Sequence, residues 1–120
     1  MKTITHAGLT LLEVAGAGPL LSTEQDAVDL IGEAYGPDAD LIVVPAARLD
    51  PQFFDLRNGM AGSFFQKMQQ YHRRLVIEGD ISEAVAASRA LRDFVYETNS
   101  VGHHLFVPDR QALLALLARL

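Results

Sequence analysis

The sequence predicts an α/β fold with a mixed, mostly parallel sheet of about five strands. An N-terminal hairpin and four to five helices complete it, in one domain spanning residues 1–120. Three observations support this prediction. Short runs of β-branched and aliphatic residues alternate with longer segments whose apolar residues recur at helical spacing. Hydrophobic residues make up 49% of the chain, which is enough to fill one core. The connections are short, and no linker, repeat or low-complexity tract interrupts them.

The chain begins with a predicted β-hairpin. Residues 2–5 and 9–14 are rich in the β-branched and aliphatic side chains that favour strands. Gly8, in the "HAG" between them, permits a tight turn. The stretch "AGAGP" then ends the hairpin, because its glycines and proline favour neither strand nor helix.

A helix is expected next. Ser22 is a favourable N-cap residue, and Gln25, three positions later, completes a capping box. Acidic residues crowd the first turns, where the helix dipole favours them. Gly36-Pro37 ends the helix. The expected buried stripe at helical spacing comprises Ala27, Val28, Ile31, Ala34 and Tyr35.

The middle of the chain predicts a strand, a turn and a helix. The continuous apolar run "DLIVVPA" is typical of a strand covered on both faces, and Pro45 ends it. Asp50 followed by Pro51 matches an N-cap with proline at the first helical position. A helix is expected from Met60. Its apolar positions at helical intervals are Met60, Phe64, Met68 and Tyr71, with Ala61, Phe65 and His72 alongside.

The last third of the chain repeats this alternation. "RLVIEGD" predicts a strand closed by Gly79, and a helix is expected from about Ser82 to Thr98, with Asn99 as its left-handed C-cap. "HHLFV" predicts a short final strand, and Asp109 is expected to cap a last helix. The expected inner face of the 82–98 helix comprises Ala84, Ala87, Leu91, Phe94 and Val95.

The composition excludes several kinds of site. The chain has no cysteine, which excludes disulfides, thiolate metal sites and a cysteine nucleophile, and suits a reducing cytoplasm. A net charge of −5, with no basic run beyond "HRR", lacks the electrostatic footprint of a nucleic-acid binder. The first residues do not resemble a signal peptide, and no apolar run approaches the roughly 20 residues of a membrane span. We therefore expect a cytoplasmic protein that binds neither nucleic acid nor membrane.

The segment "FFDLRNGMAGSFF" at 53–65 is the main candidate for a functional site. It follows the strand that Pro45 ends, and loops after the carboxyl ends of parallel strands hold functional groups. Aromatic and arginine side chains are also favoured anchors of protein interfaces. The side chains expected to contact a partner are Phe53, Phe54, Asp55, Arg57 and Asn58.

Two other interpretations of this segment stay open. The backbone amides from Gly59 to Gly62 lie at a predicted helix N-terminus, which would bind an anion with help from Arg57 or Arg92. Alternatively, Gly59 serves only a turn, and Gly62 only lets the helix approach the sheet closely. The glycine spacing matches no phosphate-binding fingerprint. Arg92 is expected either to lie on the surface or to reach the sheet rim and meet Asp80 or Glu78.

Enzymatic chemistry has less support in the sequence than binding. None of the histidines at positions 6, 72, 103 and 104 has the spacing of a zinc helix, and no nucleophile elbow is present. His103 and His104, if both lie in a strand, point to opposite faces, one half-buried and one exposed. In an enzyme built on this rim, Asp55 or His72 would be the acid–base group. We expect no catalytic residue, metal or cofactor.

The last predicted helix, "RQALLALLARL", is apolar almost all round. The leucines at 113, 114, 116, 117 and 120 cannot all face one side of a helix. Either the rest of the domain buries this helix, or part of it contacts a second copy in a homodimer.

Three stretches give a resemblance to a known family. They are "LLEVAGAGPLLSTEQDAVDLIGEAYG", "ARLDPQFFDLRNGMAGSFFQKMQQYHRRLVIEGD" and "LRDFVYETNS". Together they resemble the uncharacterised bacterial family called domain of unknown function 4180, over nearly the whole chain. That family carries no assigned activity, so the resemblance implies no catalytic residues.

More remotely, the order of elements resembles that of STAS domains, the sulfate-transporter and anti-sigma-factor-antagonist modules. In those proteins the loop before the second helix carries a serine that a kinase partner phosphorylates. Here Asp55 and Gly59 of "DLRNG" fit that loop loosely, while Leu56 and Arg57 stand where the serines would be. The resemblance implies a STAS-like regulatory module that binds a protein partner without this switch. The alternative is a small ligand- or anion-binding protein, or an enzyme, that uses residues 50–62.

Overall fold

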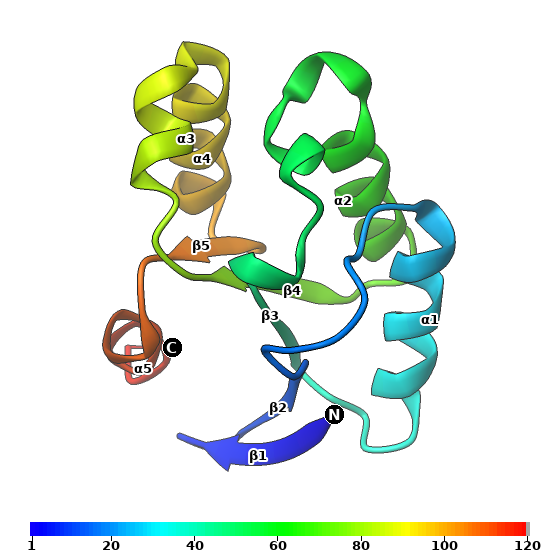
Figure 1. The fold of residues 1–120 in the computed structure, drawn as a ribbon. Coiled ribbons are helices and arrows are strands. Elements are labelled where there is room, and N and C mark those ends of the chain that lie inside the picture. Colours follow the sequence, from blue (N-terminus) through cyan, green and yellow to red (C-terminus); the bar gives the residue numbers. More distant parts are fainter. Residues whose placement is uncertain (120) are drawn as a thin grey trace.

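The computed structural model of the protein describes residues 1–119 and contains a five-stranded sheet whose strands follow one another in chain order (Figure 1). The first two strands are antiparallel, and each later strand is parallel to its neighbour. The strands are β1 (Lys2–His6), β2 (Leu9–Glu13), β3 (Leu41–Pro45), β4 (Arg74–Glu78) and β5 (Leu105–Val107). The predicted mixed, mostly parallel sheet with an N-terminal hairpin is thereby confirmed.

Five α-helices connect and cover these strands in the described part of the chain. They are α1 (Glu24–Tyr35), α2 (Met60–Gln70), α3 (Ser82–Ala87), α4 (Arg89–Val101) and α5 (Arg110–Leu117). Three short 3₁₀ turns, Ala46–Arg48, Pro51–Phe54 and Leu56–Asn58, carry the chain from β3 to α2, and together we call them the 3₁₀ segment. No helix within residues 1–119 is long and apolar enough to cross a membrane.

Alternate residues of each strand point to opposite faces of the sheet, and both faces are buried. On one face, Ile42 and Val44 of β3 join the side chains of α1, α2 and α4 in the larger core. On the other face, Leu41 and Val43 pack in a smaller core with α5 (Figure 1). A single helix, α5, therefore covers the second face, and the burial of the smaller core depends on how this helix packs.

The position of α5 answers part of the question that its sequence raised. Leu113 and Leu117 are fully buried within the chain, Leu114 and Leu116 are partly buried, and Leu120 lies outside the described residues. The domain itself thus covers much of the apolar surface of this helix. A homodimer through α5 stays a prediction.

The first helix starts one residue later than the sequence suggested. Its N-cap is Thr23, whose hydroxyl accepts from the Asp26 amide at 3.1 Å, so the predicted cap by Ser22 with Gln25 is wrong. Asp26 takes the place expected for Gln25 in the capping box, because its carboxylate accepts from the amides of both Ser22 and Thr23, at 2.7 and 3.0 Å. The buried stripe also differs, since Leu30 is buried and Tyr35 is 76% exposed.

The helix predicted over 82–98 is two helices. The backbone at Ser88 is extended, and the Ser88 hydroxyl accepts from the Leu91 amide at 3.1 Å, which caps a new helix, α4. The predicted C-cap at Asn99 is also wrong, because α4 continues to Val101 and ends at Gly102 with a φ of 81°. The Asn99 amide instead pairs with both backbone groups of Phe106, at 3.1 and 2.8 Å.

Candidate functional site

The carboxyl ends of β2, β3 and β4 form the edge of a parallel sheet at which functional groups usually lie. Two hollows lie at this edge, and Glu78, the last residue of β4, lines both of them. The ion-pair pocket is bounded by the strand ends and the start of α5, and its volume is about 460 Å³. The rim groove lies between the 3₁₀ segment and the start of α3, and its volume is about 540 Å³.

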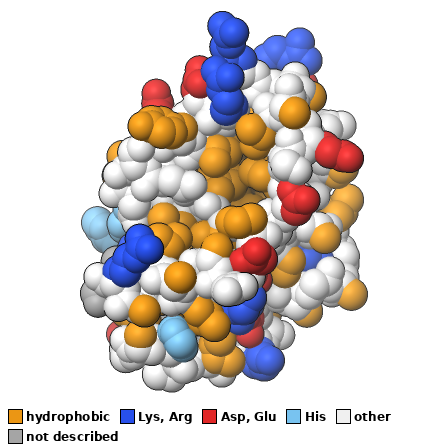
Figure 2. All heavy atoms as spheres, turned by 90° about the vertical axis from the view of Figure 1, so that its left-hand side faces the viewer, with side chains coloured by type: hydrophobic (Ala, Val, Ile, Leu, Met, Phe, Trp, Pro, Cys, Tyr) orange, Lys and Arg blue, Asp and Glu red, His pale blue; other side chains and the backbone are white. Residues whose placement is uncertain are grey.

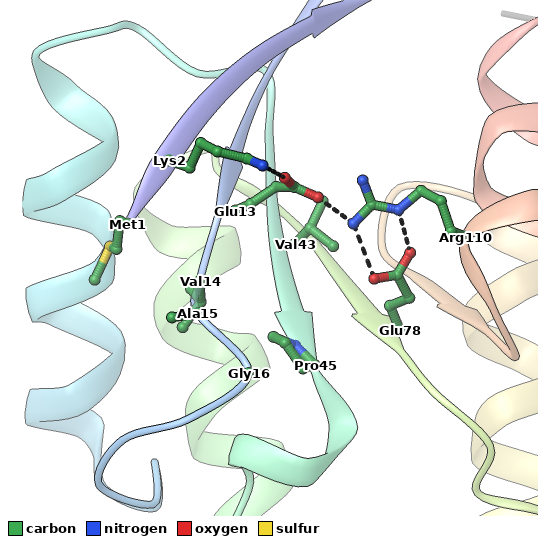
Figure 3. Close-up of a pocket in the computed structure, with 10 residues that line it drawn as sticks. All are labelled: Met1, Lys2, Glu13, Val14, Ala15, Gly16, Val43, Pro45, Glu78 and Arg110. Atoms are coloured by element: carbon green, nitrogen blue, oxygen red, sulfur yellow. Dashed lines mark hydrogen bonds and ion pairs between the residues drawn. The ribbon is translucent and has the colours of Figure 1, made fainter.

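The ion-pair pocket is organised around the guanidinium of Arg110 (Figure 3). Its Nε and Nη2 atoms donate to the two carboxylate oxygens of Glu78, at 2.6 and 3.0 Å, and Nη2 also pairs with Glu13. Lys2 lies 3.9 Å from the second oxygen of Glu13. The hydrogen bonds to Glu78, and then those to Glu13, raise the pKa of Arg110 above its usual value. Arg110 therefore stays charged and neutralises two carboxylates.

This network follows from register and capping. Glu13 and Glu78 are the last residues of β2 and β4, so both carboxylates lie at the same edge of the sheet, with β3 between them. Asp109 caps α5 by accepting from the Ala112 amide at 2.8 Å, which places Arg110 in the first turn, facing that edge. The network ties the start of α5 to two strand ends. Sequence reasoning missed it, although glutamates that end two strands and an arginine just after a cap were visible.

Replacing Arg110 by glutamine should lower the free energy of unfolding by about 1–2 kcal/mol. The two glutamate side chains are only 13% and 15% exposed, so the loss leaves two partly buried carboxylates facing each other. The expected loss is below the 3–5 kcal/mol of a fully buried pair, because the Arg110 side chain is 42% exposed. Urea unfolding followed by circular dichroism measures it. The matched control, exposed Arg119→Gln, should change stability by less than about 0.5 kcal/mol. Equal losses in the two variants would refute a stabilising role for the Arg110 network.

The rim groove combines apolar side chains with acidic ones. Phe54 of the 3₁₀ segment and Ile81, just before α3, are both partly buried and both line the groove. Asp80 accepts from the Ser82 amide at 2.9 Å, and the hydrogen bonds of Ser82 keep the pKa of Asp80 below its usual value. The other lining residues are Pro45, Ala46, Ala47, Glu78, Gly79, Ser82, Glu83 and Ala84.

A further hollow of about 280 Å³ continues from the rim groove across the turn between β4 and α3. It shares Gly79, Asp80, Ile81 and Ser82 with the groove and reaches toward α4, β5 and Pro108. Figure 2 views the side of α3, α4 and α5, and it shows apolar side chains gathered in a hollow with acidic side chains beside them. This edge of the molecule therefore offers a concave apolar surface.

Comparison with protein families gives one finding. Residues 6–117 match the family described as Domain of unknown function (DUF4180). The chain belongs to this family. No match was found among curated proteins or solved structures. The predicted family is thus confirmed over nearly the whole chain.

The structure separates the two phenylalanines that the sequence had grouped as contact residues. Phe53 is 1% exposed and stacks edge-to-face on Phe64, with ring centres 5.7 Å apart. It belongs to the core and offers no surface to a partner, because the 3₁₀ turn directs its ring inward. Phe54 packs on Phe53 at 5.5 Å and lines the rim groove. Asp50 caps this turn as predicted, accepting from the Gln52 amide at 2.9 Å.

The polar candidates of the 3₁₀ segment are exposed, and each of them forms hydrogen bonds to groups nearby in the chain. The Arg57 guanidinium, 90% exposed, donates to both carboxylate oxygens of Asp55 at 3.0 Å. The side chain of Asn58 donates to the Gln52 carbonyl and accepts from the Met60 amide, both at 2.8 Å. These contacts fix the shape of the segment. They also engage Arg57 and the Met60 amide, two of the groups on which an anion site at this helix start would depend.

Gly59, Gly62 and Arg92 have separate roles. Gly59 lies just before α2 and has a φ of 77°. Glycine adopts this left-handed backbone conformation without strain. Gly62 is exposed, and a Cβ added there would meet no atom within 4 Å, so close approach to the sheet does not require this glycine. Arg92, 59% exposed, lies 3.5 Å from Asp93. Of the two alternatives for Arg92, the surface position is the one observed, and the contact with Asp80 or Glu78 is not formed.

The adjacent histidines do not alternate across the sheet as the sequence predicted. Both precede β5, both are partly buried, and their ring centres lie 4.6 Å apart. Nδ1 of His104 accepts from the Leu75 amide at 3.0 Å, which extends the hydrogen bonding at the start of β4. Within residues 1–119, no three His, Cys, Asp or Glu side chains gather closely enough to hold a metal ion.

Proposed function

We propose that this DUF4180 chain is a non-enzymatic, STAS-like regulatory module of the cytoplasm that binds a protein partner at its sheet rim. The contact surface would consist of the rim groove and the exposed side chains of residues 54–58. One observation carries this proposal: an apolar groove of about 540 Å³ opens at the carboxyl ends of the strands. Concave apolar surfaces at this edge of α/β sheets are common binding sites.

The 3₁₀ segment suits such a role because it is held in one shape before any partner arrives. Asp50 and Asp55 cap successive turns, accepting from the amides of Gln52 and Arg57. Phe53 anchors the segment in the core, and Phe54 rests on Phe53 with one part in the groove. A rigid aromatic side chain loses little entropy on binding, which favours it as an interface anchor.

The STAS resemblance supports the same surface and predicts a difference in control. By this resemblance, Asp55 and Gly59 loosely fit the loop that carries the phosphorylated serine in STAS domains. Arg57 occupies a serine position here and pairs with Asp55. We therefore propose that partner binding at this loop proceeds without a phosphorylation switch.

The double substitution Phe54→Ala and Arg57→Ala should weaken partner capture by about tenfold or more. Tagged protein is incubated with extract of its source cells, and captured proteins are quantified by mass spectrometry. The matched control carries Tyr35→Ala and Arg119→Ala, which remove an exposed aromatic and an exposed arginine outside the rim. Thermal unfolding confirms that both variants remain folded. Equal capture by the wild type and the rim variant would refute the proposed surface.

A further inference from the structure

The charged residues of the rim groove share one sign. Glu78, Asp80 and Glu83 line it, and no lysine, arginine or histidine does. The adjoining hollow toward α4 adds no basic residue either. An apolar groove bordered only by carboxylates attracts cationic groups and repels anionic ones.

Two of these carboxylates remain available to a partner. Glu78 is held by the bidentate contact with Arg110. Within residues 1–119, neither Asp80 nor Glu83 forms an ion pair, and both are exposed. One oxygen of Asp80 accepts from the Ser82 amide, which orients the carboxylate at the turn before α3. Glu83 follows in the first turn of that helix.

A close backbone contact joins the two sides of the groove. Gly79 has a φ of 151°, and a Cβ placed on it would lie 2.8 Å from the Cβ of Ala46. The turn after β4 thus packs directly on the start of the 3₁₀ segment, as only glycine permits. This backbone contact therefore holds the turn that carries Ile81 against the segment that carries Phe54.

We infer that the partner presents a cationic amphipathic segment to this groove. One aliphatic or aromatic side chain enters between Phe54 and Ile81, and a neighbouring lysine or arginine pairs with Asp80 and Glu83. This inference rests on the proposed function and specifies the chemistry of its partner. Because the charged border is exposed, the interaction weakens as salt screens it, by several-fold between roughly 50 and 300 mM.

Selection from a phage-displayed random dodecapeptide library tests the inference. The full chain serves as bait, and selected peptides are synthesised and measured by fluorescence anisotropy. We expect sequences in which lysine or arginine lies within a few positions of a large apolar residue. The Asp80→Asn/Glu83→Gln variant should bind them about tenfold more weakly, and Phe54→Ser should also weaken them. The control Glu24→Gln/Glu33→Gln, which neutralises two exposed acids of α1, should bind them as the wild type does.

The outcomes distinguish this inference from the proposed function. Selected peptides that need Phe54 but are not cationic, and that bind the Asp80→Asn/Glu83→Gln variant normally, would overturn the inference and leave the proposed surface intact. Peptides insensitive to Phe54 and to both carboxylates, or a selection that enriches no sequence, would overturn both. Charge reversal, Asp80→Lys/Glu83→Lys, should redirect the selection to acidic peptides. An unchanged selection with that bait would also overturn the inference.

Discussion

Replacing Phe53 by alanine is expected to destabilise the protein by about 3–5 kcal/mol, the usual range for a buried phenylalanine. Phe53 is 1% exposed, and its ring packs edge-to-face on Phe54 and Phe64, with centres 5.5 and 5.7 Å away. The ring centre of Phe65 lies 6.1 Å from that of Phe53. The substitution removes both the buried apolar area and the aromatic contacts, and the surrounding rings cannot fill the space fully. Urea unfolding monitored by circular dichroism gives the loss directly.

The matched control for this prediction is the neighbouring phenylalanine. Phe54 is only partly buried, so Phe54→Ala should cost about 1 kcal/mol. Phe53→Leu, which keeps most of the apolar volume, should cost about 1–1.5 kcal/mol. If Phe53→Ala and Phe54→Ala cost the same, Phe53 would not be the core anchor of the 3₁₀ segment.

Acidification is expected to destabilise the protein through His104. Burial first, and then the charges of His103 and Arg74, lower the pKa of His104 from 6.5 to about 4. The unfolded chain therefore binds a proton at a higher pH than the folded protein does. The stability that neutral His104 contributes is complete above about pH 7 and declines as pH falls through 6.5 toward 4. Between pH 7.5 and 5 the expected loss is about 2 kcal/mol.

The surroundings of His104 explain why its protonation destabilises the folded protein. Nδ1 of His104 accepts from the Leu75 amide, so protonation of that nitrogen would break the bond. Nε2 of His104 and Nε2 of His103 are both buried and have no hydrogen-bond partner within residues 1–119. Burial also lowers the pKa of His103, which adds to the loss with the same sign. A charge on either ring would therefore be poorly compensated.

A single variant isolates the His104 contribution. In His104→Asn the side-chain oxygen can take the place of Nδ1 as the acceptor for Leu75, and it does not titrate in this range. Denaturation of both proteins at several pH values should show a flatter dependence for the variant between pH 7.5 and 5. An identical dependence in the two proteins would refute the assignment to His104.

The sequence predicted the sheet well because each strand has a local sequence pattern that identifies it. The runs ending at Pro45 and Gly79 are short, aliphatic and bounded by residues that stop a strand. The hairpin turn at Gly8 was equally clear, and that glycine has a φ of 81°. Helix boundaries were less certain because neighbouring residues compete for the same cap. The N-cap of α1 is Thr23 and not Ser22. Ser88 caps α4, which the helical periodicity alone could not separate from α3.

The candidate site was only partly predictable, for a different reason. Two adjacent phenylalanines in a 3₁₀ turn have no period of two or 3.6 to say which one points inward, so Phe53 and Phe54 could not be distinguished. The network of Glu13, Glu78 and Arg110 depends on the register of three strands and on where α5 docks. Such contacts are tertiary, and no local pattern encodes them. The loop after β3 was expected to carry functional residues, but the groove between that loop and the start of α3 was not expected, because it depends on how two loops pack together.

The most direct test of the rim as the binding surface is photo-crosslinking in the source cells. A photoreactive phenylalanine analogue at Phe54 keeps an aromatic ring in the groove, and the same analogue at exposed Tyr35 serves as the control. We predict a discrete crosslinked protein at Phe54 that is absent at Tyr35 and lost when Asp80→Asn and Glu83→Gln are added. A partner that crosslinks at Tyr35 and not at Phe54 would contradict the assignment of the rim as the site of binding.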